Sequence, residues 1–207
     1  MVSVTLRGAG KRYGNQWVFR KLDLDIPQAC KFRINGHNGS GKSTLVQLLT
    51  GQTIPTEGLI EIRNKESQIV PVEQWPFLSA IASPSLDLPE DFQLDELYSL
   101  FFRFKPAMPG LDANRFATLT ELNSHRTKAI RSFSSGMKQR VKLGLALVCS
   151  APLLILDEPL SHLDQQGIEW YRNLCNEFLQ DRTVIVCSNH FPEESFFCNQ
   201  GIELRTS

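Results

Sequence analysis

The sequence predicts an α/β fold built on a mostly parallel central sheet. Two short runs of Leu, Ile and Val, LLILD at 153–157 and TVIVCS at 183–188, are typical of strands that are buried on both faces. Helices are expected over 136–148, before the first run, and over 167–179, between the two runs. Because neighbouring parallel strands need a long crossover, usually a helix, this alternation favours a parallel sheet.

The first part of the chain is expected to contribute further strands. Residues 2–6 alternate apolar and polar side chains and predict a strand that ends at Gly-Ala-Gly, residues 8–10. The alternation over 22–26 predicts a second, half-buried strand, which Pro27 ends. The segment EGLIEIRN at 57–64 resumes the alternation and predicts another strand.

The pattern changes to helical periodicity between about 84 and 132. LDELYSLFFRF at 94–104 predicts one helix, PAMPG at 106–110 breaks it, and ANRFATLTELN at 113–123 predicts a second. We therefore expect a helical insert over about 84–132, separate from the strand-rich opening.

The length predicts a single domain. A chain of 207 residues can bury one substantial core but is too small for two domains of ordinary size. We expect one domain over 1–207, in which about 1–83 and 133–207 form the α/β core on either side of the insert.

Composition and hydropathy limit the partners and the cellular location expected for the chain. The 22 basic and 22 acidic residues balance, so nothing in the bulk charge argues for nucleic acid or a lipid surface as the main partner, and no nucleic acid is expected. The longest apolar stretch, 143–156, contains Pro152 and is shorter than the roughly 18–20 residues that span a bilayer. The N-terminus lacks the apolar region of a secretory signal, which favours a cytoplasmic location, and five scattered cysteines are expected to be reduced.

The strongest motif is GHNGSGKST at 36–44, which fits the phosphate-binding loop pattern G-x-x-x-x-G-K-[ST]. A short strand that contains Phe32 and Ile34 is expected before it, and the apolar residues from Leu45 predict a helix that follows it, with its positive end facing the phosphates. Lys42 is expected to lie between the β- and γ-phosphates, and the Ser43 hydroxyl to ligate Mg²⁺. The predicted nucleotide-binding residues of this loop are Gly36, His37, Asn38, Gly39, Ser40, Gly41, Lys42, Ser43 and Thr44.

A pair of carboxylates follows the apolar run LLILD. In an open parallel sheet, ligands bind at the carboxyl ends of the strands, where Asp157 and Glu158 are expected to lie. Asp157 is predicted to hold Mg²⁺ through water, and Glu158 to act as the general base on the attacking water.

With these motifs in order, nearly the whole chain resembles the ATP-binding-cassette (ABC) ATPases. FSSGMKQR at 133–140 resembles the family signature LSGGQ and, as in the family, precedes the motif that holds the two carboxylates. SHLD at 161–164 resembles the D-loop. The resemblance implies a P-loop NTPase of ABC type, with an antiparallel β subdomain and an inserted helical subdomain beside the parallel sheet. It also implies ATP and Mg²⁺ as ligands.

The same resemblance implies a head-to-tail dimer, in which each ATP lies between the phosphate loop of one subunit and the signature of the other. Ser134 and Gly136 would then contact the γ-phosphate held by the partner subunit. Tyr13, 29 positions before Lys42, lies where the family carries an aromatic ring that stacks on adenine, although Trp17 and Phe19 are competitors.

Two motifs of the family are changed in this chain. The signature has Ser135 where glycine is usual and Met137 where glutamine is usual. The family glutamine that contacts Mg²⁺ and the lytic water would fall at about Pro84 or Ser85, and neither side chain can do its work. The resemblance therefore implies different coupling between the nucleotide and the helical insert.

The switch histidine of the family has two candidates after the last apolar run. Asn189 directly follows the run and His190 comes one residue later. Alignment on Glu193 favours Asn189, whereas alignment on Glu194 favours His190. We include His190 among the catalytic candidates because only a histidine can both donate to the γ-phosphate and orient the water of Glu158.

The resemblance implies an ATP-binding and ATP-hydrolysing subunit of an ABC transporter, whose ATP-dependent dimerisation drives a separate transmembrane permease from the cytoplasmic face of the membrane. The aromatic-rich part of the insert, around Leu97, Phe101, Phe102 and Phe104, is the expected dock. The alternative is a soluble ABC-type ATPase that works as a mechanical or scaffolding module. A GTPase is disfavoured because NKES at 64–67 lacks the aspartate of the guanine-reading N-K-x-D motif.

Overall fold

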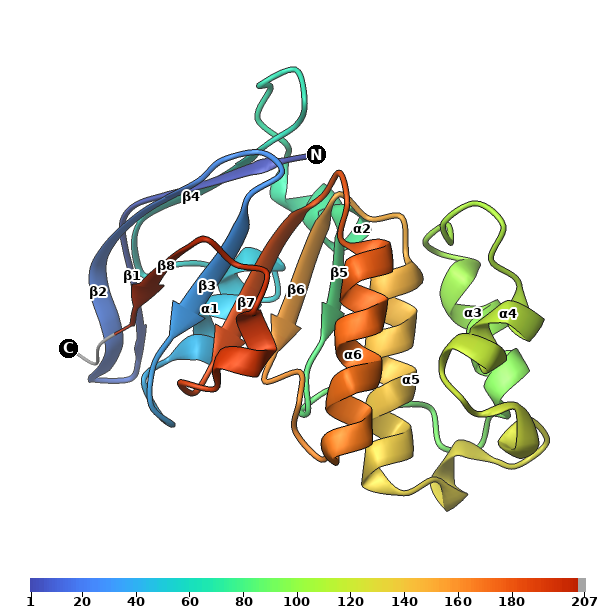
Figure 1. Ribbon diagram of the computed structural model, residues 1–207. Helices are drawn as coiled ribbons and strands as arrows, with labels where there is room; N and C mark the ends of the chain where they lie inside the picture. Colours follow the sequence, from blue (N-terminus) through green and yellow to red (C-terminus); the bar gives the residue numbers. More distant parts are fainter. Residues whose placement is uncertain (205–207) are drawn as a thin grey trace.

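The computed structural model describes residues 1–204, and a five-stranded parallel sheet lies at its centre (Figure 1). The strand order is β5-β6-β7-β3-β8, and all four neighbouring pairs are parallel. The strands are β3 (Lys31–Asn35), β5 (Ser79–Ala82), β6 (Leu153–Asp157), β7 (Thr183–Ser188) and β8 (Gln200–Glu203). The predicted parallel sheet is confirmed, and β6 and β7 are buried along their whole length.

A second, antiparallel sheet of three strands stands beside the first, with the order β2-β1-β4. Its strands are β1 (Ser3–Tyr13), β2 (Gln16–Ile26) and β4 (Glu57–Arg63). The expected end of the first strand at residues 8–10 is wrong, because β1 continues to Tyr13. Register shifts between Leu6 and Ala9 absorb the irregularity, and Gly8 there has a φ of 56°.

Helices cover the parallel sheet on both faces (Figure 1). Helix α1 (Lys42–Leu49) lies between the two sheets, whereas α5 (Ser135–Val148) and α6 (Gln165–Phe178) lie side by side on the opposite face. The strands divide their side chains accordingly. Leu153 and Ile155 of β6 join the core around α1, and Leu154 and Leu156 join the core around α5 and α6.

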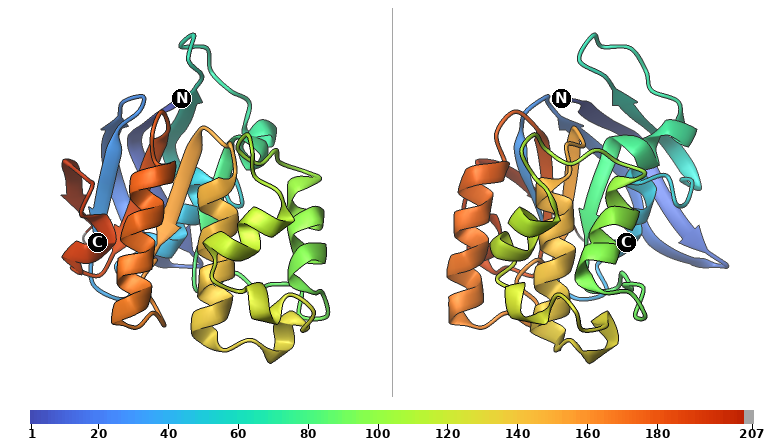
Figure 2. Two further views of the ribbon diagram at one scale, coloured as in Figure 1. Left: turned by 45° about the vertical axis from the view of Figure 1, so that its right-hand side comes forward. Right: turned by 90° about the vertical axis from the view of Figure 1, so that its right-hand side faces the viewer.

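The insert forms its own small helical layer against α5 (Figure 2). It contains α3 (Leu94–Phe102) and α4 (Ala113–Leu119), which lie where helices were predicted. Between β4 and the insert, the short helix α2 (Trp75–Leu78) and β5 were not predicted. Single 3-10 turns complete the described structure: η1 (Val72–Gln74), η2 (Asn123–His125), η3 (Ile130–Ser132) and η4 (Pro192–Ser195).

Across residues 1–204, none of the helices combines the length and the apolar character that crossing a membrane would require.

Candidate nucleotide-binding site

The phosphate-binding loop connects the carboxyl end of β3 to the first turn of α1, and close packing explains two of its glycines. A Cβ on Gly36 would lie 2.4 Å from Ser40 Oγ. Gly41 has a φ of 98°, and a Cβ there would lie 2.5 Å from Val18 Cγ1. Any other residue at these positions would clash or be strained, so the sequence forces the backbone into a compact cradle at the positive end of α1.

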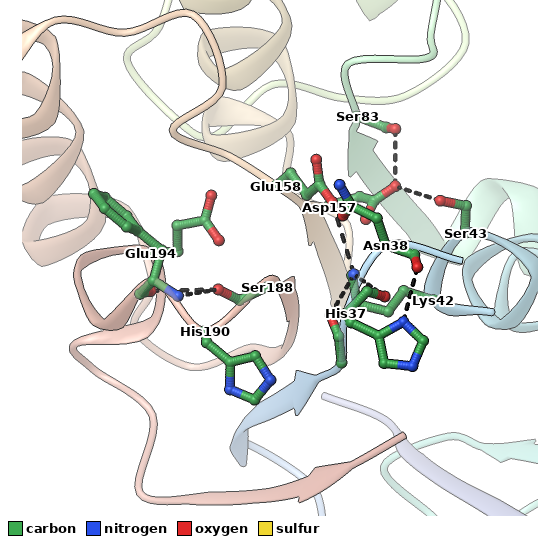
Figure 3. Close-up of polar contacts among 12 residues, drawn as sticks. His37, Asn38, Lys42, Ser43, Ser83, Asp157, Glu158, Ser188, His190 and Glu194 are labelled. Carbon is green, nitrogen blue, oxygen red and sulfur yellow. Dashed lines mark hydrogen bonds and ion pairs between the residues drawn. The ribbon is translucent and has the colours of Figure 1, made fainter. Parts of the chain in front are cut away.

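Lys42 is the buried cation of this loop, with 5% of its surface exposed. Its Nζ donates hydrogen bonds to the carbonyl oxygens of Gly36 at 2.7 Å and His37 at 3.3 Å, and lies 3.7 Å from Glu158 Oε1 (Figure 3). The ammonium group is therefore held at the centre of the loop, within reach of the carboxylate that follows β6.

Asp157, at the end of β6, faces the start of α1. Its Oδ2 accepts hydrogen bonds from Ser83 Oγ at 3.0 Å and Ser43 Oγ at 3.4 Å (Figure 3). Its Oδ1 is buried and has no hydrogen-bond partner within residues 1–204. Burial raises the pKa of this carboxyl, and the nearby charge of Glu158 acts in the same direction. The site thus combines hydroxyl and carboxylate oxygens with one unsatisfied acceptor, which fits a hard cation such as Mg²⁺.

Glu158 has an unusual backbone conformation, with a φ of 44°. Its N–H donates to the carbonyl oxygen of Cys187 on β7 at 2.9 Å, which fixes the turn after β6. A non-glycine residue in this left-handed region is uncommon and is often found at functional sites. Here the turn directs the half-exposed carboxylate of Glu158 toward Lys42 instead of continuing the strand.

These residues surround an open hollow of about 520 Å³, which we call the loop hollow. It is lined by Tyr13, Val18, Asn38, Gly39, Gly41, Lys42, Ser43, Thr44 and Glu158. The structure therefore brings together the predicted loop, the predicted general base and the predicted aromatic residue. Together they offer an anion-binding cradle, a carboxylate and an exposed ring around one space.

Among the three aromatic candidates, Tyr13 has the accessible ring. It is 51% exposed, and its hydroxyl donates to Gln47 Oε1 at 3.4 Å. Phe19 is buried in the core. Trp17 packs under the guanidinium groups of Arg12 and Arg20, 5.4 and 4.1 Å from its ring centre. Only Tyr13 of the three lines the loop hollow.

The FSSGMKQR segment lies apart from this hollow. Ser134 is the N-cap of α5, and its Oγ accepts a hydrogen bond from the N–H of Met137 at 3.2 Å. Gly136 lies close to the D-loop, because a Cβ there would be 3.0 Å from the carbonyl oxygen of His162. Figure 1 shows the start of α5 well separated from α1. One chain does not bring Ser134 and Gly136 to its own phosphate loop.

The two switch candidates follow β7 in an exposed turn. His190 has a φ of 57°, and its Nε2 lies 3.1 Å from Glu203 Oε1. Its ring points away from Glu158 (Figure 3). Asn189 is exposed.

Two polar residues near the site were not singled out by the sequence patterns. Ser83 is the hydroxyl donor to Asp157 described above. Glu194 is buried in η4, where its Oε1 accepts a hydrogen bond from the N–H of Leu160 at 3.3 Å, while its Oε2 is unpaired in the described part of the chain. Burial raises the pKa of Glu194 to about 6, and the charges of Glu158 and Asp157 also raise it.

Comparison with known proteins also indicates a nucleotide-binding protein. The profile described as "ABC transporter" matches residues 19–161. The lantibiotic transport ATP-binding protein SrtF of Streptococcus pyogenes is 30% identical over 191 residues, covering 89% of this chain and 78% of the relative. The Nod factor export ATP-binding protein I of Cupriavidus metallidurans is 30% identical over 197 residues, covering 92% of this chain and 63% of the relative.

Solved structures share the fold. An ATP-binding subunit of an ABC transporter superposes with a TM-score of 0.82 at 22% identity, covering 98% of this chain and 85% of that one. A dimeric ATP-binding cassette in a post-hydrolysis state, bound to ADP and Pi, has a TM-score of 0.81 at 22% identity, covering 98% and 94%. The family match, the curated relatives and the site geometry agree: the chain belongs to the ABC transporter family, as a subunit that binds and hydrolyses ATP.

Proposed function

We propose that the loop hollow binds ATP and that Lys42, Ser43, Asp157 and Glu158 carry the hydrolysis in this ABC subunit. The observation that supports this most is the convergence of three separate segments on one space. The phosphate loop, the turn after β6 and Tyr13 of β1 all line or border the hollow. Such convergence at the carboxyl edge of a parallel sheet is the usual location of a ligand site.

ATP would lie with its phosphates in the cradle formed by residues 36–44 and its base on Tyr13. The backbone N–H groups of the loop and of the first turn of α1 would donate to the phosphate oxygens, and Lys42 would neutralise the β- and γ-phosphates. Stacking of adenine on the exposed ring of Tyr13 would add about 1–3 kcal/mol. The rigidity of the glycine cradle means that these donors need little rearrangement on binding.

Mg²⁺ is the cation that we expect at Ser43 and Asp157. The close pair of oxygens and the unsatisfied Oδ1 of Asp157 support this assignment. When bound, Mg²⁺ would reduce the negative charge on the phosphate oxygens.

Glu158 is the proposed general base. Its carboxylate would accept a proton from a water molecule as the water oxygen forms a bond to the γ-phosphorus. The bond from the γ-phosphorus to the β,γ-bridging oxygen then breaks, and the electron pair leaves with ADP. The fixed turn at Glu158 keeps this carboxylate beside the hollow. His190 can assist only if its contact with Glu203 opens, because that contact holds the ring away from Glu158.

The other half of the site would come from a second subunit. Since the start of α5, where Ser134 and Gly136 lie, is well separated from α1 in one chain (Figure 1), a head-to-tail dimer is the arrangement that would bring them to the γ-phosphate. The open N-terminus of α5 supplies N–H donors for this contact. Loss of the γ-phosphate would remove the shared ligand and allow the two subunits to separate.

A separate transmembrane permease is the proposed working partner, with this subunit peripheral at the cytoplasmic side of the membrane. The curated relatives are named as transport and export ATP-binding proteins. An apolar groove of about 450 Å³, between the insert and α5, offers a dock for the permease. It is lined by residues that include Ile81, Leu88, Leu97, Phe101, Phe104 and Leu145. We call it the insert groove.

The partner can be tested by affinity capture from the membranes of the source cells. Phe104 is 67% exposed in the insert groove, and Phe77, on α2, is 65% exposed outside it, so the two form a matched pair. We expect the wild-type chain and Phe77→Asp to recover one multi-span protein, and Phe104→Asp to lose it. Recovery of soluble partners only by the wild-type chain would favour the scaffolding alternative over transport.

A further inference from the structure

Ser83 lies where this chain departs from its family. It follows the last residue of β5, and only 2% of its surface is exposed. Its Oγ donates to Asp157 Oδ2 at 3.0 Å and lies 2.9 Å from the hydroxyl of Ser85. The nearby positions expected to carry the family glutamine are Pro84, which has no polar side chain, and Ser85, which contacts Ser83.

The position of Ser83 is fixed from two sides. On one side, β5 pairs with β6 so that Ala82 lies opposite Leu156, which brings the next residues of the two strands, Ser83 and Asp157, together. On the other side, Lys142 Nζ of α5 donates to the carbonyl oxygen of Pro84 at 2.8 Å. The Ser83 hydroxyl is therefore held by sheet pairing and by an anchored turn, and its own rotation is limited by burial.

A fixed donor matters because the Asp157 carboxylate could otherwise rotate. Two hydroxyls, Ser83 and Ser43, meet at its Oδ2, while Oδ1 finds no partner in the described residues. When Ser43 ligates the cation, its hydroxyl would no longer donate to Asp157. Ser83 would then be the side chain that orients the carboxylate. Partners that orient a metal ligand commonly change metal affinity by about 10- to 100-fold.

We infer that Ser83 is a positioning residue that orients the Asp157 carboxylate and so sets the affinity of the site for its divalent cation. This inference rests on the proposed function, in which Asp157 and Ser43 hold Mg²⁺. It assigns to a buried serine directly after β5 a part of the task for which the family uses a glutamine.

The test measures cation binding instead of turnover. Mn²⁺ replaces Mg²⁺, and electron paramagnetic resonance reports free Mn²⁺ in the presence of a non-hydrolysable ATP analogue and excess protein. We expect Ser83→Ala to raise the apparent Kd for Mn²⁺ by about 10- to 100-fold. Ser83→Thr, which keeps the hydroxyl, should remain within about threefold of the wild type, and Ser83→Cys, a weaker donor, should be intermediate.

Ser79→Ala is the matched control. Ser79 is also a buried serine, but it lies at the opposite end of β5, where its hydroxyl donates to the carbonyl oxygen of Trp75 at 2.9 Å. It should bind Mn²⁺ like the wild type even if its Tm falls. In EDTA, all variants should bind the ATP analogue equally.

Two results would overturn the inference. If Ser83→Ala lowers Tm but binds Mn²⁺ as the wild type does, Ser83 is only a structural residue. If Ser83→Ala does not fold, equal Mn²⁺ affinity of Ser83→Cys and Ser83→Thr has the same meaning. A wild-type chain that binds the analogue but no Mn²⁺ with it would instead overturn the proposed cation site itself, and the inference with it.

Discussion

Replacement of Glu194 by glutamine should stabilise the fold at neutral pH but not in acid. The carboxyl is 5% exposed, lies near Asp157 and Glu158, and has one oxygen without a partner in residues 1–204. Burial raises its pKa from 4.5 to about 6, so ionisation is harder in the folded chain than in the unfolded chain. Glu194→Gln keeps the shape and an oxygen that can accept from the N–H of Leu160, but it cannot ionise.

The sign follows from proton binding. Between these two pKa values the folded state of the wild type holds more protons than the unfolded state, so its stability falls as pH rises through this window. A rise from 4.5 to about 6 corresponds to about 2 kcal/mol, which is fully lost above about pH 7. Between pH 5 and pH 7.5 the loss is about 1 kcal/mol, because the unfolded carboxyl is already largely ionised at pH 5.

Urea unfolding of the wild type and Glu194→Gln at pH 5 and pH 7.5 measures this effect. Subtracting the two proteins cancels the titration of Asp157 and of other groups that they share. We expect the variant to gain about 1 kcal/mol over the wild type on going from pH 5 to pH 7.5. A difference that does not depend on pH, or one that shrinks at pH 7.5, would refute the assignment of Glu194 as a buried group with a raised pKa.

Three further predictions concern the site and its support. Lys42→Ala should lower ATP turnover by about 10²- to 10³-fold in a phosphate-release assay, because the buried cation of the loop is lost; unchanged turnover would contradict its role. Tyr13→Ala should raise the Kd for ATP by about 5- to 150-fold in calorimetric titrations, and an unchanged Kd would exclude stacking. Gly144→Ala places a Cβ 2.6 Å from Thr120 Cγ2 and 3.0 Å from Phe116 Cε2. Overpacking of about 1–3 kcal/mol should outweigh the gain of about 1 kcal/mol in helix propensity, so a higher urea midpoint would argue against tight packing of α4 on α5.

Much of the fold could be predicted because its strands carry strong patterns. The runs that form β6 and β7 are largely apolar. The phosphate-loop motif predicts a strand directly before it and a helix directly after it. The shorter strands β5 and β8 were missed, since four residues such as SAIA or QGIE have no clear period. They are strands because β6 and β3 offer them an unpaired edge.

The residues of the site also fall into two groups, those that the sequence motifs predicted and those that they did not. Residues within a motif could be found from spacing, because the chemistry requires contiguous residue types. Ser83 could not, because its role depends on the pairing of β5 with β6, a contact between segments 74 positions apart. Glu194 could not be distinguished from its neighbour Glu193 by sequence, since only the docking of η4 under Leu160 buries one of them. These two residues could be found only from strand pairing and burial, which are properties of the tertiary structure.

The shared ATP site between two subunits is tested most directly by the mass of Glu158→Gln in solution. This change preserves the loop hollow and its cation ligands but removes the general base, so bound ATP should persist. Light scattering during gel filtration with saturating ATP and Mg²⁺ should give the mass of two chains. Without nucleotide, or in the double variant that also carries Lys42→Ala, it should give the mass of one chain. A single-chain mass for Glu158→Gln with ATP and Mg²⁺ present would contradict the composite site.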